Sequence, residues 1–254
     1  MAKSKGIGQH PIFKLGKAPA KRDPRNLKFA AILKTPVALP KEYDFDLKHP
    51  GIPTPMFGND RYGDCVIAGR AHQTLRFELI EQKTKLQISD KEVLREYLKE
   101  TGGRDSGLVV LDSLKVWRKP GWTAAKNVYT IKAFSELNRA NHNQVKQAIV
   151  LDVGVGLGLS LPISAQGQFQ AGKPWDVVGG SNGKPNSWGG HYVLVPGYTT
   201  KGPVCVTWAR KHQMTWAFFD KYCDEAYAII DAIDTAKKKK ALDAKALGDF
   251  LRSL

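Results

Sequence analysis

A cysteine stands at the predicted start of a helix in the stretch GNDRYGDCVIAGRAHQTL, residues 58–75. Cys65 follows a glycine-containing turn, and from it apolar residues recur at spacings of three and four, the pattern of one helix face. A helix N-terminus stabilises a thiolate through the helix dipole and its unpaired N–H groups, which lowers the thiol pKa. Cys65 is therefore either a nucleophile or a small apolar residue that packs against a sheet.

A thiol nucleophile also needs a base and hydrogen-bond donors for the developing oxyanion. His191 is the best candidate base, because it opens a predicted strand directly behind a glycine-rich loop that would hold its ring rigidly. Asn59 lies six residues before Cys65 and could donate its side-chain amide beside the Cys65 N–H. The glycine run GVGLG at 154–158 lies inside a predicted strand, and we interpret it as close sheet packing rather than a phosphate site.

The elements that must position these residues change character along the chain. Helical patterns dominate the first half, including one that starts at a Ser89–Glu92 capping box and stops at Gly102. Strand-like runs dominate the second half, at residues 150–161, 191–198, 202–208 and 225–231. Because helices and strands are segregated and no βαβ alternation is present, the sequence predicts an α+β fold with an antiparallel sheet.

The composition fits a globular chain without cysteine-based staples. The 254 residues include three cysteines at irregular spacing, which argues against a disulfide framework and against a cysteine-rich zinc site. We expect neither a metal nor another cofactor. The sequence contains no signal-peptide pattern and no long apolar run, which predicts a cytoplasmic protein or one associated with a particle.

The net charge of +15 is concentrated at the two ends of the chain. Residues 1–34 carry +8 and residues 237–254 carry +4, which leaves +3 for the residues between them. Basic ends can bind nucleic acid or another polyanion through counterion release, and solubilising tails are the alternative. The C-terminal run also places its apolar residues on one side of a basic amphipathic helix, which we expect to dock on the body of the protein.

The order and spacing of these motifs resemble the papain-like cysteine peptidases. The segment LPKEYDFDLKHPGIPTPMFGNDRYGDCVIAG is similar to the start of the mature domain in that family. In this comparison Asn59 takes the place of the family's Gln, and Cys65 that of the nucleophile, at the same spacing. WGGHYVLVPGY resembles the family's histidine-bearing strand, and VTWA resembles its NSWG element.

The resemblance implies an α+β fold with a helical N-terminal half, an antiparallel β-barrel-like C-terminal half and an active-site cleft between them. It divides the chain into a basic N-terminal arm (residues 1–37), a papain-like domain (38–231) and a basic amphipathic C-terminal helix (232–254). The implied activity is a thiol hydrolase that cleaves peptide or isopeptide bonds through a Cys–His dyad. Cys65 would attack the carbonyl, and His191 would relay the proton.

Three positions depart from the family pattern. Asn59 is one methylene shorter than Gln, although it can still donate to an oxyanion. Asp64 places a carboxylate beside the thiol, which would raise the Cys65 pKa. The family's histidine-orienting Asn corresponds to Val206 or, after a shift of one residue, to Thr207, whose hydroxyl could bond the imidazole. Two loop residues before the histidine, Asn182 and Asn186, are weaker substitutes.

Three functions therefore stay open. The first is hydrolysis of a peptide or protein substrate. The second is transamidation, in which the acyl group passes to an amine. The third is a catalytically weak or inactive papain-fold structural protein, carried in a particle, whose basic arms (residues 1–34 and 237–254) bind nucleic acid or partner subunits. The arm could also lie in the cleft.

Overall fold

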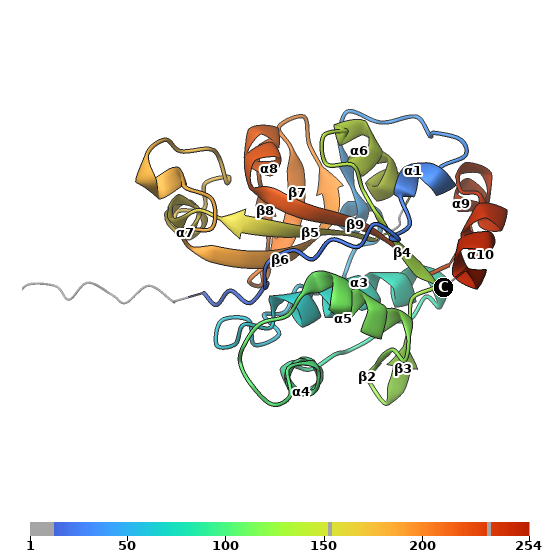
Figure 1. The fold of residues 1–254 in the computed structure, drawn as a ribbon, viewed down its shortest axis with the longest axis horizontal. Coiled ribbons are helices and arrows are strands. Elements are labelled where there is room, and N and C mark those ends of the chain that lie inside the picture. The colour runs from blue at the N-terminus through green and yellow to red at the C-terminus, as the bar shows by residue number, and fades with distance from the viewer. Residues whose placement is uncertain (1–12, 152–153, 233–234, 254) are drawn as a thin grey trace, which may run out of the picture.

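The structure, a computed structural model, describes residues 13–151, 154–232 and 235–253 (Figure 1). Its helices are α1 (Phe29–Ile32), α2 (Phe45–Lys48), α3 (Cys65–Glu81), α4 (Asp90–Glu100), α5 (Val110–Arg118), α6 (His142–Val150), α7 (Ile163–Gln170), α8 (Trp216–Tyr222), α9 (Ala236–Ala241) and α10 (Ala244–Arg252), with a 3-10 turn η1 (Ser181–Gly183). Its strands are β1 (Tyr43–Asp44), β2 (Trp122–Ala124), β3 (Asn127–Tyr129), β4 (Ala133–Glu136), β5 (Gly154–Leu161), β6 (Gly189–Tyr198), β7 (Pro203–Thr207), β8 (Arg210–Gln213) and β9 (Cys223–Ile230). None of the helices in these ranges combines the length and the apolar character that crossing a bilayer requires.

One antiparallel sheet organises the molecule. Its strands follow the order β4-β9-β5-β6-β7-β8, and β1 adds to β6, whereas β2 and β3 form a separate hairpin. The α+β fold class is thus confirmed. The barrel-like half is an open sheet, because in the described part of the chain β4 and β8 form its two edges and do not pair with each other.

The sheet separates two layers of helices (Figure 1). Helices α3, α4 and α5 lie on one side, where Tyr227 and Ile229 of β9 pack into the same apolar cluster as Cys65. Successive residues of a strand point to opposite faces, so Ala226 and Ala228 of the same strand belong to the other cluster. The first half of the chain therefore supplies one wall of the site, and the sheet supplies the other.

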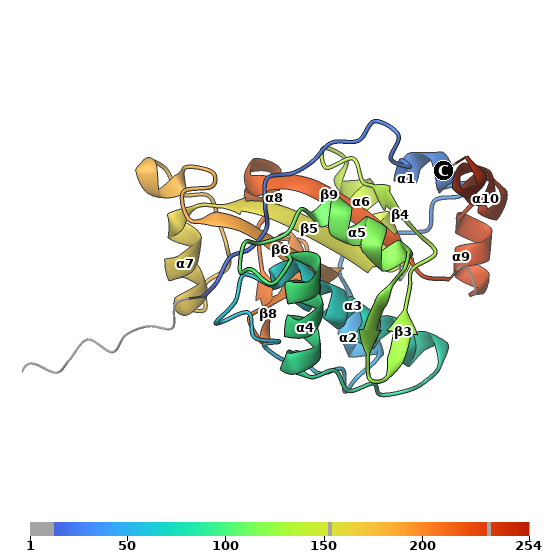
Figure 2. The ribbon, with the colours of Figure 1, turned by 60° about the horizontal axis from the view of Figure 1, so that its bottom comes forward.

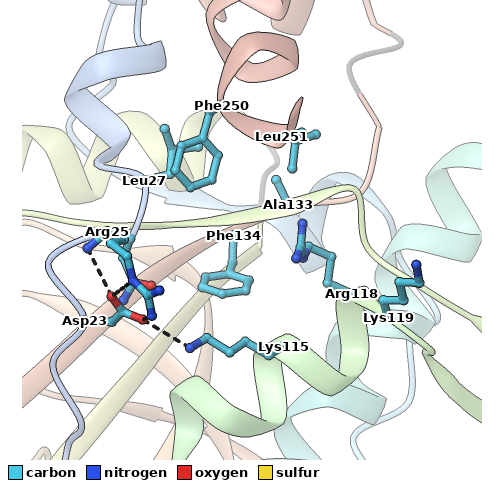
Figure 3. Close-up of a pocket in the computed structure, with 11 residues that line it drawn as sticks. Asp23, Arg25, Leu27, Lys115, Arg118, Lys119, Ala133, Phe134, Phe250 and Leu251 are labelled. Carbon is cyan, nitrogen blue, oxygen red and sulfur yellow. Dashed lines mark hydrogen bonds and ion pairs between the residues drawn. The ribbon is translucent and has the colours of Figure 1, made fainter. Parts of the chain in front are cut away.

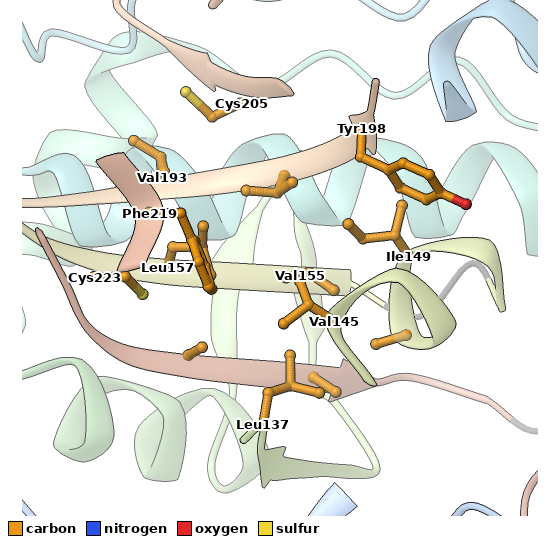
Figure 4. Packing of buried hydrophobic residues seen from close by; sticks show 14 of the residues in the cluster. Leu137, Val145, Ile149, Val155, Leu157, Val193, Tyr198, Cys205, Phe219 and Cys223 are labelled. Carbon is orange, nitrogen blue, oxygen red and sulfur yellow. The ribbon is translucent and has the colours of Figure 1, made fainter. Parts of the chain in front are cut away.

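The second cluster fills the face of the sheet that is turned away from α3 (Figure 4). Val155 and Leu157 of β5 and Val193 of β6 pack there against Val145 of α6 and Phe219 of α8. These side chains are almost completely removed from water. Burial of this kind contributes about 25 cal/mol for each Å² of apolar surface, which holds β5 and β6 in a fixed position.

The glycines of β5 allow close packing against the helical half. A Cβ atom at Gly154 would lie 2.2 Å from the Gln73 side chain, and one at Gly156 would lie 1.8 Å from the Tyr192 hydroxyl. This confirms the packing interpretation of the glycine run. The strand is shorter than the predicted one, because α6 extends to Val150.

The C-terminal tail forms two helices instead of the single predicted helix. The chain breaks between α9 and α10 because Asp243 accepts a hydrogen bond from the Ala246 N–H and caps the second helix. The tail docks on the N-terminal arm, where the Asp243 N–H donates to the Ile32 carbonyl at 2.8 Å. Leu247 of α10 is completely buried in this contact region, and Figure 2 shows α9 and α10 beside α1.

Candidate active site

Cys65 is the first residue of α3 and is 1% exposed. Helix α3 packs along β6, and the absence of a side chain at Gly69 brings it close to the Tyr192 ring. Burial raises the pKa of the Cys65 thiol to about 12, although backbone hydrogen bonds from Tyr192 and Gly16 act in the opposite direction. The lowered pKa expected at a helix N-terminus is therefore not realised in this state, because desolvation outweighs the helix dipole.

His191 lies near the start of β6, one residue before Tyr192, and its ring is fixed from two sides. The imidazole Nε2 is 2.7 Å from the Thr207 hydroxyl, and the ring stacks on Trp208 with centroids 4.2 Å apart. A hydroxyl both donates and accepts, so it can pair with either neutral tautomer. Nδ1, also buried, has no hydrogen-bond partner in the described ranges. Burial lowers the pKa of His191 to about 3, so the ring is neutral.

The structure places Thr207, and not Val206, beside the imidazole. Thr207 is the last residue of β7 and is buried. Asn182 and Asn186, the weaker candidates for this position, are exposed. The hydrogen-bonded partner of the His191 ring is thus the threonine of the shifted alignment.

Asn59 is buried in the turn before α3. Its side-chain Nδ2 donates to the Tyr62 carbonyl at 3.1 Å, which uses one of the two amide hydrogens. The backbone carbonyl of Asn59 accepts a hydrogen bond from the Lys14 N–H at 3.3 Å. The amide also forms a side-chain hydrogen bond that lowers the pKa of the neighbouring Asp64 carboxyl, so an oxyanion must compete with Asp64 for the second amide hydrogen.

Asp64 is completely buried beside Cys65. Burial raises the pKa of its carboxyl to about 8, against the opposing effect of the neighbouring Asn59. The carboxyl is therefore largely protonated at neutral pH. The full negative charge that the sequence placed next to the thiol is largely suppressed, and Asp64 raises the thiol pKa less than the sequence suggested.

The N-terminal arm runs across the mouth of this site. The Lys17 N–H donates to the Gly190 carbonyl at 3.0 Å, next to His191, and the Gly16 carbonyl accepts from the Leu108 N–H at 2.8 Å. Figure 1 shows this blue segment crossing the sheet beside the helical half on its way to α1. The arm thus bridges the two walls of the site with backbone hydrogen bonds on each side.

The arm approaches the turn before Cys65 closely. A Cβ atom at Gly16 would lie 1.6 Å from the Gly63 carbonyl oxygen, so no other residue type fits there without displacement of the backbone. Further upstream, Phe13 packs against Phe169 and Trp208 with ring centroids 4.9 Å away in each case. The arm therefore contributes to the burial that sets the pKa values of the thiol and the imidazole.

The sequence left open a place for the arm in the cleft, and the structure shows the arm there, but the individual contacts were not predicted. A glycine followed by a lysine carries no local signal for a position in a cleft, since both residue types are common in flexible segments. The stacking of Trp208 on His191 was not predicted either. Trp208 served in the alignment only as the tryptophan of the VTWA motif.

A separate cavity of about 330 Å³ lies where the two ends of the chain meet (Figure 3). Its floor is apolar and includes Phe134 of β4 and Phe250 of α10. Its rim is cationic, with the residues Arg25, Lys115, Arg118 and Lys119. Asp23 accepts hydrogen bonds from the first two of these.

No family model matches the chain. No curated protein matches it either. Among solved structures, xylellain, a cysteine protease from Xylella fastidiosa, superposes with a TM-score of 0.67 at 19% identity over 90% of this chain and 100% of that one. A cysteine protease from Carica candamarcensis superposes with a TM-score of 0.56 at 15% identity, over 76% of this chain and 99% of that one. Procathepsin B from Trypanosoma congolense superposes with a TM-score of 0.59 at 14% identity, over 86% of this chain and 87% of that one. The fold is papain-like. These papain-like neighbours are all cysteine proteases, and at such identities they establish the fold, whereas the roles of individual residues must be argued from geometry.

Proposed function

We propose that the chain is a papain-like cysteine peptidase, with Cys65 as the nucleophile and His191 as the proton carrier. Thr207 orients the imidazole, and Asn59 together with the Cys65 N–H stabilises the oxyanion. The proposal includes the division of the chain into a basic arm (residues 1–37), a papain-like domain (38–231) and a basic C-terminal segment (232–254).

The observation that carries the proposal is the fixed orientation of the His191 ring. A ring that is hydrogen-bonded through Nε2 and stacked on a tryptophan has one orientation, and this leaves Nδ1 for proton exchange with a thiol. His72 and His212 also each have a buried ring nitrogen without a hydrogen-bond partner, so the unpaired Nδ1 alone does not set His191 apart. The feature that supports a functional role is the combination of the Thr207 hydrogen bond with the stack on Trp208.

The proposed reaction follows from these positions. The Cys65 proton passes to His191 as the sulfur bonds to the substrate carbonyl carbon, and the negative charge moves onto the carbonyl oxygen. Collapse of this intermediate breaks the carbon–nitrogen bond, and His191 gives its proton to the leaving amine. Water then attacks the thioester, which releases the acid and restores the thiol. Transfer to a second amine instead of water would give transamidation, and a lysine side-chain amide as substrate would give isopeptide cleavage.

The described state is a closed form of this peptidase. The arm excludes solvent from a site in which the thiol is protonated and the imidazole is neutral, as the pKa of each group indicates. Displacement of the arm exposes both groups to water and permits the charged thiolate–imidazolium pair that catalysis needs. We therefore expect the full chain to be slow until residues 13–18 leave the cleft.

Gly16→Ala in the full chain tests the proposal. The added methyl group cannot be accommodated beside Gly63, so the arm should leave the site. We expect Cys65 to react with a thiol reagent at least about tenfold faster than in the wild type, and peptide hydrolysis to appear and to be abolished by Cys65→Ala. Gly167→Ala, at a helical glycine with open space around it, is the matched control. If Cys65 in Gly16→Ala reacts no faster than the buried Cys205 and Cys223, the proposal is wrong.

Binding of a polyanion is the second candidate, and the cation-rimmed cavity of Figure 3 supports it. Several cations of the two ends are instead paired within the protein. Lys21 lies 3.0 Å from Asp112, and Lys245 lies 2.9 Å from Asp249. We place this function second because paired cations release fewer counterions when a polyanion binds.

A further inference from the structure

Lys17 of the arm is a buried cation at the edge of the candidate active site. Its side chain is 1% exposed, and its Nζ lies 3.0 Å from an Asp224 carboxylate oxygen and 3.3 Å from a Glu225 carboxylate oxygen. Both acidic residues belong to β9 in the body of the protein. A segment that crosses the cleft thus inserts its lysine between two carboxylates of the cleft wall.

The wall has space for a long, unbranched side chain at this position. A Cβ atom at Gly158 would lie 2.6 Å from the Lys17 Cε and 2.5 Å from the Glu225 Cγ. On the neighbouring strand, a Cβ atom at Gly190 would lie 2.1 Å from the Lys17 carbonyl oxygen. The two glycines therefore leave a slot for an extended backbone and for a side chain with four methylene groups.

The slot adjoins the proposed nucleophile. Gly16, one residue before the lysine, contributes a backbone hydrogen bond to the Cys65 thiol, and the Lys17 ammonium itself lowers the Cys65 pKa. The Lys17 N–H pairs with the Gly190 carbonyl directly before His191. A peptide that binds along the path of Gly16 and Lys17 past the thiol would place one side chain between the carboxylates of β9.

Departure of the arm leaves this pair without its cation. The Ser160 hydroxyl donates to Asp224 at 2.6 Å, and the Tyr227 hydroxyl donates to Glu225 at 3.3 Å, so both carboxylates stay oriented. These hydroxyls do not neutralise the charge. After the arm has left, water enters the slot, but the two adjacent carboxylates still attract a cation, which favours a basic side chain as the replacement for Lys17.

We propose that the slot formed by Gly158, Asp224 and Glu225 is a specificity subsite that takes a lysine or arginine side chain of the substrate. Lys17 occupies it in the closed form and imitates that side chain. This inference rests on the proposed peptidase function and names its substrate class, namely peptides with a basic residue near the scissile bond.

The test uses the full chain carrying Gly16→Ala and peptide probes that alkylate a reactive cysteine. Tripeptide acyloxymethyl ketones carry lysine or norleucine, which differ only in the ammonium group, at each of the three positions in turn. The rate of Cys65 modification is followed by intact mass. At one position we expect lysine to react at least about tenfold faster than norleucine, as expected for a buried charge pair.

Three companion variants locate the effect. Asp224→Asn combined with Glu225→Gln should bring the two rates to about the same value, and Asp224→Asn alone, at a partly exposed residue, should reduce the preference. Asp112→Asn, which removes a carboxylate paired with Lys21 of the same arm outside the slot, should leave the preference unchanged. The rates of the lysine and norleucine probes are also compared in a chain that carries Lys17→Met instead of Gly16→Ala. The result then does not depend on the correct folding of a single variant.

Different results would refute the subsite and the peptidase. Equal modification of Cys65 by lysine and norleucine probes at all three positions would show that the slot serves only to dock the arm, and it would leave the peptidase intact. Absence of Cys65 modification by every probe in both backgrounds would refute the peptidase and the subsite together.

Discussion

The hydrogen bond between Thr207 and His191 offers the sharpest test of the proposed mechanism. Thr207→Val keeps the shape of the side chain and removes the hydroxyl that lies 2.7 Å from Nε2. His191 then has both ring nitrogens buried without a partner, which costs about 1–3 kcal/mol. If that energy is what holds the ring in its productive orientation, the chemical step slows by about 5- to 150-fold.

The assay separates positioning from folding. In the Gly16→Ala background, kcat and KM for a peptide and the pH dependence of Cys65 modification are measured beside urea unfolding. We expect kcat to fall while KM stays constant, because Thr207 contacts the imidazole and not the substrate. Thr207→Ser retains a hydroxyl and should recover most of the rate.

Thr74→Val is the matched control. Thr74 is also buried, and its hydroxyl donates to the Arg70 carbonyl at 3.0 Å within α3. Its loss should lower the free energy of unfolding and leave kcat unchanged. A Thr207→Val enzyme whose kcat stays within about twofold of its parent, with the same pH profile, would refute the orienting role of this hydroxyl.

Three further predictions concern charge. Because the pKa of Asp64 is raised to about 8, the contribution of Asp64 to the unfolding free energy falls as pH rises from 4 to 8; Asp64→Asn should therefore raise the unfolding free energy by about 1 kcal/mol or more at pH 8 and by little at pH 4, measured by urea unfolding at both values. Burial lowers the pKa of His191 to about 3 and that of His212 to about 4, so the contribution of these two histidines has the opposite sign and falls from pH 6.5 towards pH 4; His212→Gln should reduce this loss, and an unchanged loss would contradict the assignment. Arg118→Ala combined with Lys119→Ala should weaken polyphosphate binding and reduce its salt dependence if the cavity of Figure 3 is a polyanion site, and equal binding by both proteins would exclude that site.

The features predicted correctly from the sequence are those with local signals. The helix at Cys65 follows from its apolar spacing, and the helix after Ser89 follows from its capping box, which the structure contains in full. The break in the tail is not predicted, because the apolar residues of the tail fit one continuous amphipathic helix, whereas Asp243 caps a second helix. A capping residue inside an amphipathic pattern is compatible with one continuous helix and with a break between two helices, and tertiary contacts decide which of the two forms.

The chemistry of the site depended on contacts between distant segments. Thr207 and Val206 differ by one residue in the alignment, and only the pairing of β6 with β7 decides which side chain lies beside the imidazole. The helix position of Cys65 favours a low thiol pKa, but burial raises the pKa, and the arm from the start of the chain contributes to that burial. Nothing in the sequence near Asp224 indicates that a lysine from that arm lies against it.

The anchoring of the arm beyond the cleft has a kinetic consequence. After the segment that crosses the site, the Leu27 carbonyl accepts from the Glu136 N–H at 2.7 Å, and Leu33 forms a bridge with Leu242 of the tail. In the proposed peptidase, the segment that crosses the site would thus act as a tethered competitor whose effective concentration is on the order of millimolar, whatever the protein concentration. Dilution cannot activate such an enzyme. A substrate must instead out-compete a ligand carried by the same chain, and cutting the tether would convert that ligand into a peptide that diffuses away.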